Sequence, residues 1–428
     1  MTRVLLFSHT TGYQLRAFDD AAARLGIELV FATDRCHRLD DPWQDRAIPV
    51  RFYDIPLSLD RIFRRAREFP VGGILAVGDR PVVLAAHVAQ ALGIRWHSVA
   101  GAEASTDKCR SRVLLATAGL PAPRFAIRNL RAALRDLRPG LGDPRPDVSF
   151  PVVLKPVGLS GSRGVIRAND DEEYAEAFDR IRALLARPDV RAARTGLEDE
   201  ILVEQYIDGD EFALEGVLTD GVLRVFALFD KPDPLVGPFF EETIYVTPSR
   251  TAPELQSRIA KAVEAAAHAL GLGHGPVHAE CRMTPQGEIY ILEVAARPIG
   301  GLCSRVLTFA SPPVSLEMVL LQHAIGQSID RYTREPDAAA VMMIPIPRRG
   351  IFKRMNGVEA ASRVAGVSEI RITAKEGQML EPLPEAGSYL GFLFARGGRP
   401  EDAERAVRDA HALLDPEIAP ALLADARG

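Results

Sequence analysis

The sequence lacks the features that mark a membrane protein or a nucleic-acid-binding protein. Its 428 residues carry a net charge of −5, and the basic residues are spread along the chain, so no strong field for nucleic acid or an acidic membrane is expected. No apolar run is long enough to span a bilayer. The short apolar N-terminal stretch fits a first strand better than a signal peptide. The composition, 47% apolar and 25% charged, is typical of a globular protein.

Cysteines are few and far apart in the sequence. The four are Cys36, Cys109, Cys281 and Cys303, and no two form a CxxC pair, so neither a zinc site nor a disulfide framework is indicated. Free thiols suit a reducing compartment, and we expect a cytoplasmic protein. Cys281 and Cys303 are predicted to be small packed residues, because no suitable base is placed near them in the sequence.

Two common nucleotide-binding motifs are absent as well. Residues 1–100 alternate apolar strands with amphipathic helices, which predicts a doubly wound parallel sheet. They contain no GxGxxG, so a dinucleotide-binding fold is not supported. Ligands of such sheets bind at the carboxyl ends of strands, here near residues 8–12 and 78–80. The glycine-rich turn Ser160–Gly164 is not a Walker A loop, which would end in Gly-Lys followed by Ser or Thr.

Hydrophobic periodicity and turn residues predict the secondary structure along the whole chain. A loop or linker is expected at 138–146. The predicted strands are 3–8, 27–32, 47–52, 73–77, 150–155, 201–206, 211–217, 222–229, 276–281, 289–295, 341–345 and 369–373. The predicted helices are 14–25, 59–68, 82–92, 101–119, 172–186, 255–270, 315–325 and 401–414.

The hairpin predicted within residues 275–301 is the most informative segment. Each of its strands carries one acidic residue among apolar neighbours, Glu280 in the first and Glu293 in the second. Unpaired carboxylates on half-buried strands are costly, and two that converge repel each other unless a cation lies between them. Mg²⁺ suits such oxygen ligands and often binds nucleotide phosphates as well. The alternative is a surface hairpin whose acids are solvated.

Two basic residues complete a candidate phosphate site. Arg297 follows Glu293 by four residues and could hold an anionic substrate or a transferring phosphoryl group. Lys155 ends the apolar strand PVVLK and needs an anionic partner. The loop that follows, with Ser160, Gly161, Ser162 and Gly164, offers backbone N–H groups that suit phosphate oxygens, although a plain turn is an equal alternative.

The run EQYIDGDE at 204–211 suggests where a nucleoside could bind. A strand edge at Gln205–Ile207 can hydrogen-bond a purine rim, Glu204 could accept from an exocyclic amine, and Glu211 could accept from ribose hydroxyls. A solvated acidic loop is the alternative. Lys231, after the strand 222–229, is a further candidate for phosphate or substrate binding.

Three histidines lie near the hairpin in the sequence. His278 is close to the outward face of the predicted strand 276–281, which carries the candidate metal ligand Glu280, and His278 is a candidate substrate contact. His268 and His274 are predicted to be surface or loop residues.

The order of these motifs resembles the ATP-grasp superfamily of carboxylate–amine ligases, over roughly residues 100–305. Asp107-Lys108 comes first, followed by Lys155 with its glycine-rich loop, Glu204 with Glu211, and the hairpin with Arg297. The resemblance implies an ATP-grasp fold after the N-terminal sheet. It also implies an ADP-forming ligase that makes a carbon–nitrogen bond through an acyl phosphate, uses ATP and Mg²⁺, with Mn²⁺ as a substitute, and takes small-molecule carboxylate and amine substrates.

The resemblance further implies a role for each residue. The catalytic set is Lys155, Glu293 and Arg297, and the metal ligands are Glu280 and Glu293. The nucleotide set is Lys108, Lys155, Ser160, Gly161, Ser162, Gly164, Glu204, Gln205, Tyr206, Ile207, Glu211 and Lys231. The substrate set is His278, Arg297, Gly300 and Gly301.

One position departs from the superfamily pattern, which often has Asn two residues after the second metal-binding Glu. Here that position is Ala295, which cannot ligate a metal. The departure, the run His278-Ala279-Glu280 and the tail at 387–394 are similar to L-amino acid ligases, the branch that forms dipeptides. Amino acid substrates are therefore expected, and a homodimer is kept open.

The resemblance divides the chain into five parts. These are a Rossmann-like domain at 1–100, a connecting helix at 101–122, a central lid subdomain at 123–207, a catalytic subdomain at 208–330 and a mixed subdomain at 331–428. Two other functions stay open: a biotin-carboxylase-like or formate-using purine-pathway enzyme, and a nucleotide-binding regulatory protein without turnover. The run Pro298-Ile299-Gly300-Gly301 disfavours a biotin carboxylase. Retention of the charged motifs argues against a protein that has lost turnover.

Overall fold

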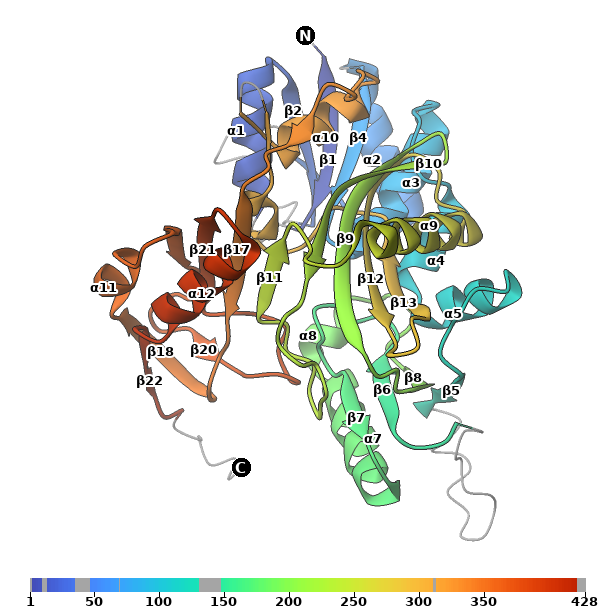
Figure 1. Ribbon diagram of the computed structural model, residues 1–428. Helices are drawn as coiled ribbons and strands as arrows, with labels where there is room; N and C mark the ends of the chain where they lie inside the picture. The colour runs from blue at the N-terminus through green and yellow to red at the C-terminus, as the bar shows by residue number, and fades with distance from the viewer. Residues whose placement is uncertain are drawn as a thin grey trace, which may run out of the picture.

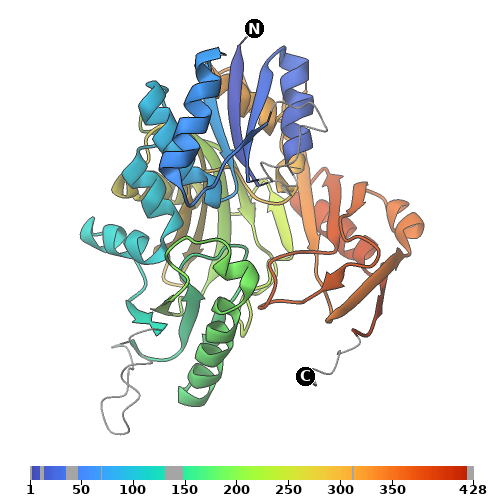
Figure 2. The ribbon, with the colours of Figure 1, turned by 180° about the vertical axis from the view of Figure 1, so that it is seen from behind.

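The computed structural model describes residues 2–9, 14–34, 47–68, 70–130, 148–310 and 313–421 (Figures 1 and 2). The predicted loop at 138–146 and Cys36 lie outside these ranges. The N-terminal layer lies at the top of Figure 1, and a long central sheet lies below it. Two segments extend from this sheet in different directions: the green one within 123–207, called the lid segment after its predicted role, and the red C-terminal segment. Among the described residues, no helix is both long and apolar enough to cross a membrane.

The N-terminal layer is the predicted parallel sheet, with strand order β3-β2-β1-β4. Its apolar strands are buried because helices cover both faces. The helix α10 comes from far along the chain and packs beside α1 on one face, while α2 and α3 lie on the other. The elements are β1 Arg3–Ser8, α1 Leu15–Leu25, β2 Glu28–Thr33, β3 Ile48–Pro49, α2 Ile55–Glu68, β4 Gly73–Val77, α3 Arg80–Leu92 and α10 Leu316–Ala324.

The prediction of a single connecting helix at 101–119 is wrong, because two helices occupy this region. They are α4, Val99–Thr106, and α5, Lys108–Thr117. Asp107 separates them with an extended backbone, φ −117° and ψ 104°, and its carboxylate accepts from the N–H groups of Cys109 and Arg110. An aspartate that caps a new helix stabilises a break that hydrophobic spacing alone does not show.

The lid segment contains an antiparallel sheet with strand order β5-β8-β6-β7. The helix α7 packs on one face of it, and its first turn carries three acidic residues that favour a helix N-terminus. The strand β5 was not predicted from the sequence. The elements are β5 Phe125–Asn129, β6 Val152–Pro156, β7 Ile166–Ala168, α7 Asp171–Leu185, α8 Pro188–Arg191 and β8 Glu200–Gln205.

The central sheet has eight strands in the order β13-β12-β9-β10-β11-β17-β21-β19. The strands predicted at 211–217 and 222–229 are β9 and β10, and they form a hairpin with positive φ at Asp220 (50°) and Gly221 (89°), as a two-residue hairpin turn requires. Strands from the C-terminal segment extend this sheet through β11 and β17. The elements are β9 Asp210–Thr219, β10 Val222–Asp230, β11 Ile244–Thr247, α9 Pro253–Leu270, β12 Gly275–Met283, β13 Ile289–Ala295, β17 Ala338–Ile344, β19 Val367–Ile372 and β21 Gly391–Gly397.

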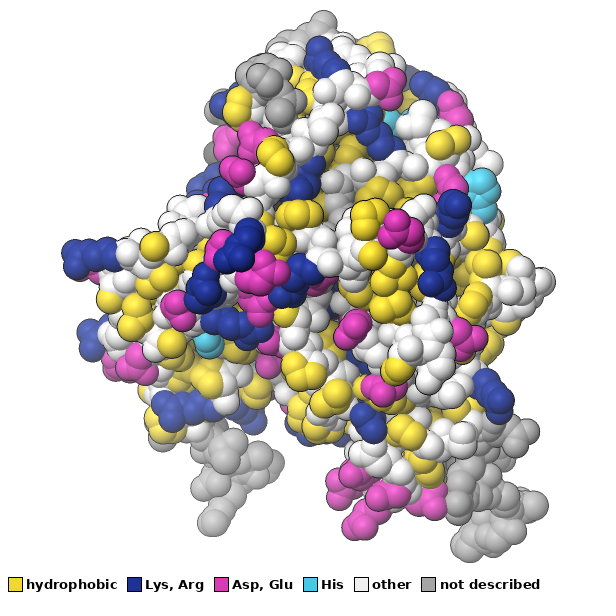
Figure 3. Space-filling model, in the orientation of Figure 1, with side chains coloured by type: hydrophobic (Ala, Val, Ile, Leu, Met, Phe, Trp, Pro, Cys, Tyr) yellow, Lys and Arg dark blue, Asp and Glu magenta, His cyan; other side chains and the backbone are white. Residues whose placement is uncertain are grey.

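Small sheets and short helices complete the C-terminal half. The helix α12 covers β17 and β21, and in Figure 3 basic and acidic side chains alternate over it, as the ion pair between Arg408 and Glu404 illustrates. The remaining elements are a 3₁₀ helix at Cys303–Val306, β14 Thr308–Ala310, β15 Val314–Ser315, β16 Thr333–Arg334, β18 Gly350–Asn356, α11 Val358–Ser362, β20 Met379–Leu380, α12 Pro400–His411 and β22 Asp415–Ala419.

Three buried histidines meet where β12 begins. The rings of His274 and His323 stack with centroids 4.5 Å apart. The His97 ring contacts the Pro276 carbonyl oxygen at 3.0 Å. His274 lies in a loop, as predicted, but is buried rather than on the surface, whereas His268 is exposed. The pKa of His97 and that of His323 are lowered to about 4, mainly because burial disfavours the charged imidazole. The neighbouring histidines contribute to both shifts, and Arg95 contributes to that of His323.

These histidines predict that the protein loses stability in mild acid. The unfolded chain binds protons on His97 and His323 below about pH 6.5 and the folded chain only below about pH 4, so the free energy of unfolding falls as the pH drops through this window. The slope is at most about 1.4 kcal/mol per pH unit for each histidine. Urea unfolding at pH 7 and pH 5 measures the loss. His97→Gln should reduce it and His268→Gln should not; equal losses in both variants would contradict the assignment.

Candidate active site

A cavity of about 330 Å³ lies where the N-terminal layer, the lid sheet, the central sheet and the C-terminal segment meet. Every site residue predicted from the sequence lines this cavity except Gly164 and Lys231. The structure also brings in residues that sequence reasoning did not select. They include Glu242, Tyr245, Arg282, Gly387, Tyr389 and Phe392.

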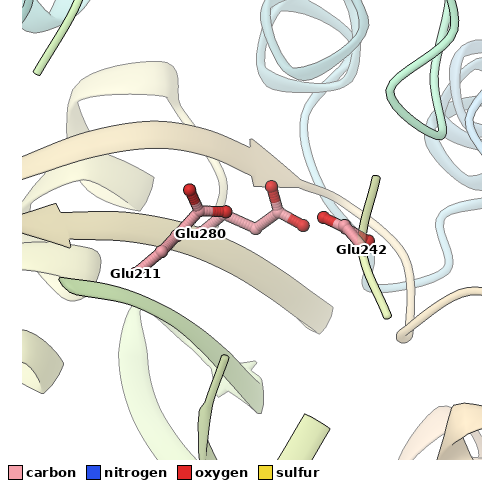
Figure 4. A group of neighbouring side chains, drawn as sticks. All are labelled: Glu211, Glu242 and Glu280. Carbon is pink, nitrogen blue, oxygen red and sulfur yellow. The ribbon is translucent and has the colours of Figure 1, made fainter. Parts of the chain in front are cut away.

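Three glutamates form the most acidic part of the cavity wall. Glu211 on β9, Glu242 before β11 and Glu280 on β12 each place a carboxylate oxygen within 4.8 Å of the others (Figure 4). The ammonium of Lys231, directly after β10, lies 2.7 Å from Glu211, 2.7 Å from Glu242 and 3.2 Å from Glu280. Lys231 is therefore bound by three carboxylates behind the cavity wall.

Burial and charge act against each other in this cluster. Burial alone would lower the pKa of Lys231, but the three carboxylates hold it well above its ordinary value. Burial and the Glu280 charge raise the pKa of Glu242 to about 7. Burial would raise the pKa of Glu280 too, yet Lys231 and His278 hold it well below its ordinary value. Glu242 thus carries a proton more easily than Glu280.

The predicted hairpin is confirmed, and it sets Glu280 opposite Glu293. The two residues are partners in the pairing of β12 with β13, so their side chains leave the same face of the sheet toward the cavity. Ala295 is opposite His278 in the same ladder and is buried. The carboxylates that line this part of the cavity are hard oxygen donors, which fits Mg²⁺ or Mn²⁺, while Lys231 already neutralises part of their charge.

Arg297 reaches from the end of the hairpin to the N-terminal layer. Its Nε donates to Asp79 at 2.8 Å, a second nitrogen lies 3.5 Å from the same carboxylate, and Glu293 is 3.8 Å away. Asp79 follows β4, within the strand-end region 78–80 where the sequence predicted ligand binding. Although burial would raise the pKa of Asp79, Arg297 and Lys108 lower it. The pair fixes the guanidinium beside the cavity.

His278 lies between two glutamates. Its Nδ1 is 3.2 Å from an oxygen of buried Glu215, and its Nε2 is 3.7 Å from Glu280. The Ile299 N–H donates to the same Glu215 oxygen at 3.0 Å. Burial would lower the pKa of His278, but Glu215 and Glu280 raise it to about 9. Glu215 was not selected from the sequence, although a single acidic residue within the apolar run of β9 is a signal that could have identified it.

The nucleotide-side residues include a buried ion-pair network. Glu204 pairs with Lys155 and accepts from Arg112 at 2.8 Å. Arg112, which sequence reasoning missed, also donates to the Leu292 carbonyl at 2.7 Å, so it ties α5 to both β8 and β13. Burial lowers the pKa of Lys155, and Glu204 opposes that effect. Lys108 donates to the Leu159 carbonyl oxygen.

The glycine-rich turn packs against the C-terminal segment. The Gly164 N–H donates to the Pro384 carbonyl at 2.9 Å, and Arg163 donates to the Glu385 carbonyl at 2.8 Å. Arg187 on the lid segment also pairs with Glu381 at 2.7 Å. These contacts place the turn over the cavity, although Gly164 does not line it.

Comparisons with known proteins identify this architecture. Family models match three consecutive parts of the chain: an ATP-grasp N-terminal domain over 18–94, an ATP-grasp domain over 148–306 and an L-amino acid ligase C-terminal domain 2 over 342–419. The chain is therefore an ATP-grasp protein. Its C-terminal part is of the L-amino acid ligase type.

Similar proteins agree with that class. The crystal structure of an L-amino acid ligase from Bacillus licheniformis is 26% identical, with a TM-score of 0.81, and the match covers 98% of this chain and 99% of that one. An alanine–anticapsin ligase of Bacillus subtilis is 29% identical over 56% of this chain, which spans 52% of that ligase. A D-alanine–D-alanine ligase of Aromatoleum aromaticum is 29% identical over 51% of this chain and 64% of its own length. The predicted fold class and the predicted ATP-grasp ligase are confirmed.

Proposed function

We propose that the protein joins two amino acids through an amide bond, with ATP as the energy source and ADP and phosphate as products. The convergence of Lys155, Arg297, Glu280 and Glu293 on one cavity carries this proposal. Cations and carboxylates that line the same cavity suit a reaction in which phosphoryl transfer depends on positioning and charge neutralisation. The L-amino acid ligase domain at the C-terminus and the similar ligases support an amino acid as substrate.

The reaction takes two steps. The carboxylate of one amino acid attacks the γ-phosphorus of ATP, which gives an acyl phosphate and releases ADP. The amine of the second attacks the acyl carbon, inorganic phosphate leaves, and the amine loses a proton. Lys108 and Lys155 bind the nucleotide phosphates, and Arg297 holds the acyl phosphate. The turn Ser160–Gly164 excludes water, because an exposed acyl phosphate would hydrolyse.

The remaining predicted roles stay proposals. Glu280 and Glu293 would hold Mg²⁺, with Mn²⁺ as a substitute, and the ion would neutralise phosphate charge. Glu204, Gln205, Tyr206 and Ile207 would border adenine, and Glu211 would bind ribose. Lys231 was predicted to bind phosphate or substrate, but its three carboxylate partners and its place outside the cavity lining disfavour that role. His278, Gly300 and Gly301 would contact substrate.

The domain division, the compartment and the assembly are proposals too. We keep the boundaries 1–100, 101–122, 123–207, 208–330 and 331–428. The cytoplasm is the expected compartment, because the cysteines that the structure describes, Cys109, Cys281 and Cys303, are all free thiols. A homodimer stays open.

A phosphate-release assay with ATP, Mg²⁺ and pairs of amino acids tests the function. Phosphate and ADP that form only when both amino acids are present, together with a dipeptide found by mass spectrometry, would support the ligase. Dependence on bicarbonate or formate would instead favour a carboxylase-like or purine-pathway enzyme. ATP binding without product from any pair would favour a regulatory protein.

Glu293→Gln should bind ATP but lose nearly all turnover. The substitution removes one negative charge from a proposed metal ligand and weakens neutralisation of the transferring phosphoryl group. ADP formation across a range of Mg²⁺ concentrations measures the effect. Glu288→Gln, an exposed residue in the turn of the same hairpin, is the control. Parent-like turnover of Glu293→Gln at low Mg²⁺ would refute the metal assignment.

A further inference from the structure

The cavity has one wall without charged side chains, made mostly by the C-terminal half of the chain. We call the cavity-lining side chains Cys303, Met343, Tyr389 and Phe392 the apolar wall. They come from the 3₁₀ helix, β17, the segment before β21 and β21 itself. Residues from three separate segments therefore meet at one surface.

Close contacts fix the apolar wall in place. The sulfur atoms of Cys303 and Met343 are 3.5 Å apart, and the rings of Tyr389 and Phe392 meet edge to face with centroids 6.2 Å apart. A Cβ at Gly301 would lie 2.8 Å from the Phe392 ring, so the ring packs directly on the glycine backbone. Gly301, four residues after Arg297, thus adjoins the wall.

The ionisable groups of this wall stay neutral. Burial raises the pKa of the Cys303 thiol and of the Tyr389 hydroxyl well above their ordinary values, and Glu242 raises both further. Arg297, which faces the cavity beside the wall, is paired with Asp79, and Lys231 is held by its three glutamates. A charged substrate side chain here would lose water and find no free partner in the wall, whereas an apolar side chain would be stabilised by contact.

We propose that the apolar wall receives the side chain of the amino acid held beside Arg297, and that the ligase therefore selects an apolar side chain at this position. The inference rests on the proposed function, since it assumes that amino acids are the substrates. The Arg297 guanidinium would hold the carboxylate end of this amino acid. Its side chain would then lie against the apolar wall, which adjoins Gly301. Selectivity would come from the shape of Phe392 and Tyr389.

A series of near-isosteric amino acids tests this proposal. Each test amino acid is paired with alanine, and kcat/KM is measured together with the dipeptide made. Leucine is compared with asparagine and aspartate, and methionine is compared with glutamate. We expect leucine and methionine to exceed their polar counterparts by about 100-fold, since a buried polar group left unpaired is strongly rejected. Dipeptide formed equally well from charged and apolar members would overturn this inference and leave the ligase function intact. ADP formation from no pair would overturn both.

Two variants and a matched control locate the selectivity. Phe392→Leu should shift the kcat/KM ratio between phenylalanine and alanine about tenfold toward the larger substrate, because the smaller leucine side chain enlarges the cavity beside the wall. Phe394→Leu removes the same volume two residues along β21, in the same apolar cluster but outside the cavity lining. It should lower the melting temperature similarly without changing that ratio. Tyr389→Ala, in a less buried residue, should shift the ratio in the same direction. An unchanged ratio in Phe392→Leu and Tyr389→Ala would overturn the assignment.

Discussion

Arg297→Lys should bind ATP like the parent but lower coupled ligation by about 100-fold, and uncoupled ATP hydrolysis much less. The guanidinium is a planar fork that can hold Asp79 and still face an acyl phosphate, and a lysine ammonium cannot reproduce that geometry. An intermediate that is held less well reaches water before the amine attacks it. The ratio of dipeptide to ADP should therefore fall.

ADP and dipeptide measured in the same reaction, with the melting temperature beside them, separate this role from a structural one. Arg305→Lys is the matched control, because Arg305 pairs with Glu369 at 2.6 Å outside the cavity lining. A purely structural Arg297 would depress ADP and dipeptide together. If Arg297→Lys couples ADP to product as tightly as the parent, Arg297 does not hold the intermediate.

Lys231→Met should be the most destabilising single change considered, costing about 3–5 kcal/mol of the free energy of unfolding. Lys231 is buried, and its ammonium lies against Glu211, Glu242 and Glu280. Removing the ammonium takes away the one cation that contacts all three carboxylates, and Arg282 at Glu211 and His278 at Glu280 compensate only in part, so the carboxylates repel one another. Urea unfolding without divalent ions measures the loss.

Lys261→Met, on the exposed side of α9, is the control and should leave the free energy of unfolding nearly unchanged. Addition of Mg²⁺ should recover more stability in Lys231→Met than in the parent, because the three carboxylates are hard oxygen donors. An unfolding free energy equal to that of the parent would show that Lys231 does not hold the cluster together.

Local patterns in the sequence were enough to predict the elements that carry the acidic residues. Apolar runs bounded by turn residues predicted β12 and β13, and the antiparallel register then sets Glu280 opposite Glu293. Apolar runs also predicted the strands β9 and β10. The order of charged motifs was enough to predict the ATP-grasp superfamily and many of the residues that line the cavity. These features depend on neighbours in the chain, and a single sequence records them.

Partners from distant segments were the features that the sequence did not predict. Glu242 lies beside Glu211 and Glu280 because β11 is next to β10 in the central sheet, and no spacing in the sequence predicts that contact. Asp79 meets Arg297 across two layers, 218 residues apart in the chain. Arg112 was hidden because a fully buried arginine on a helix looks like a surface residue until its partner Glu204 is known.

The sequence by itself determined the chemical groups, their order and the strands and turns that present them, since these follow from hydrophobic periodicity and turn chemistry. Only the tertiary structure decided which groups meet. The helix α10 packs into the N-terminal layer, and β21 brings Phe392 to the cavity that Arg297 lines. The reason is physical: each apolar face must be covered by another element, and packing can bring that element from any part of the chain.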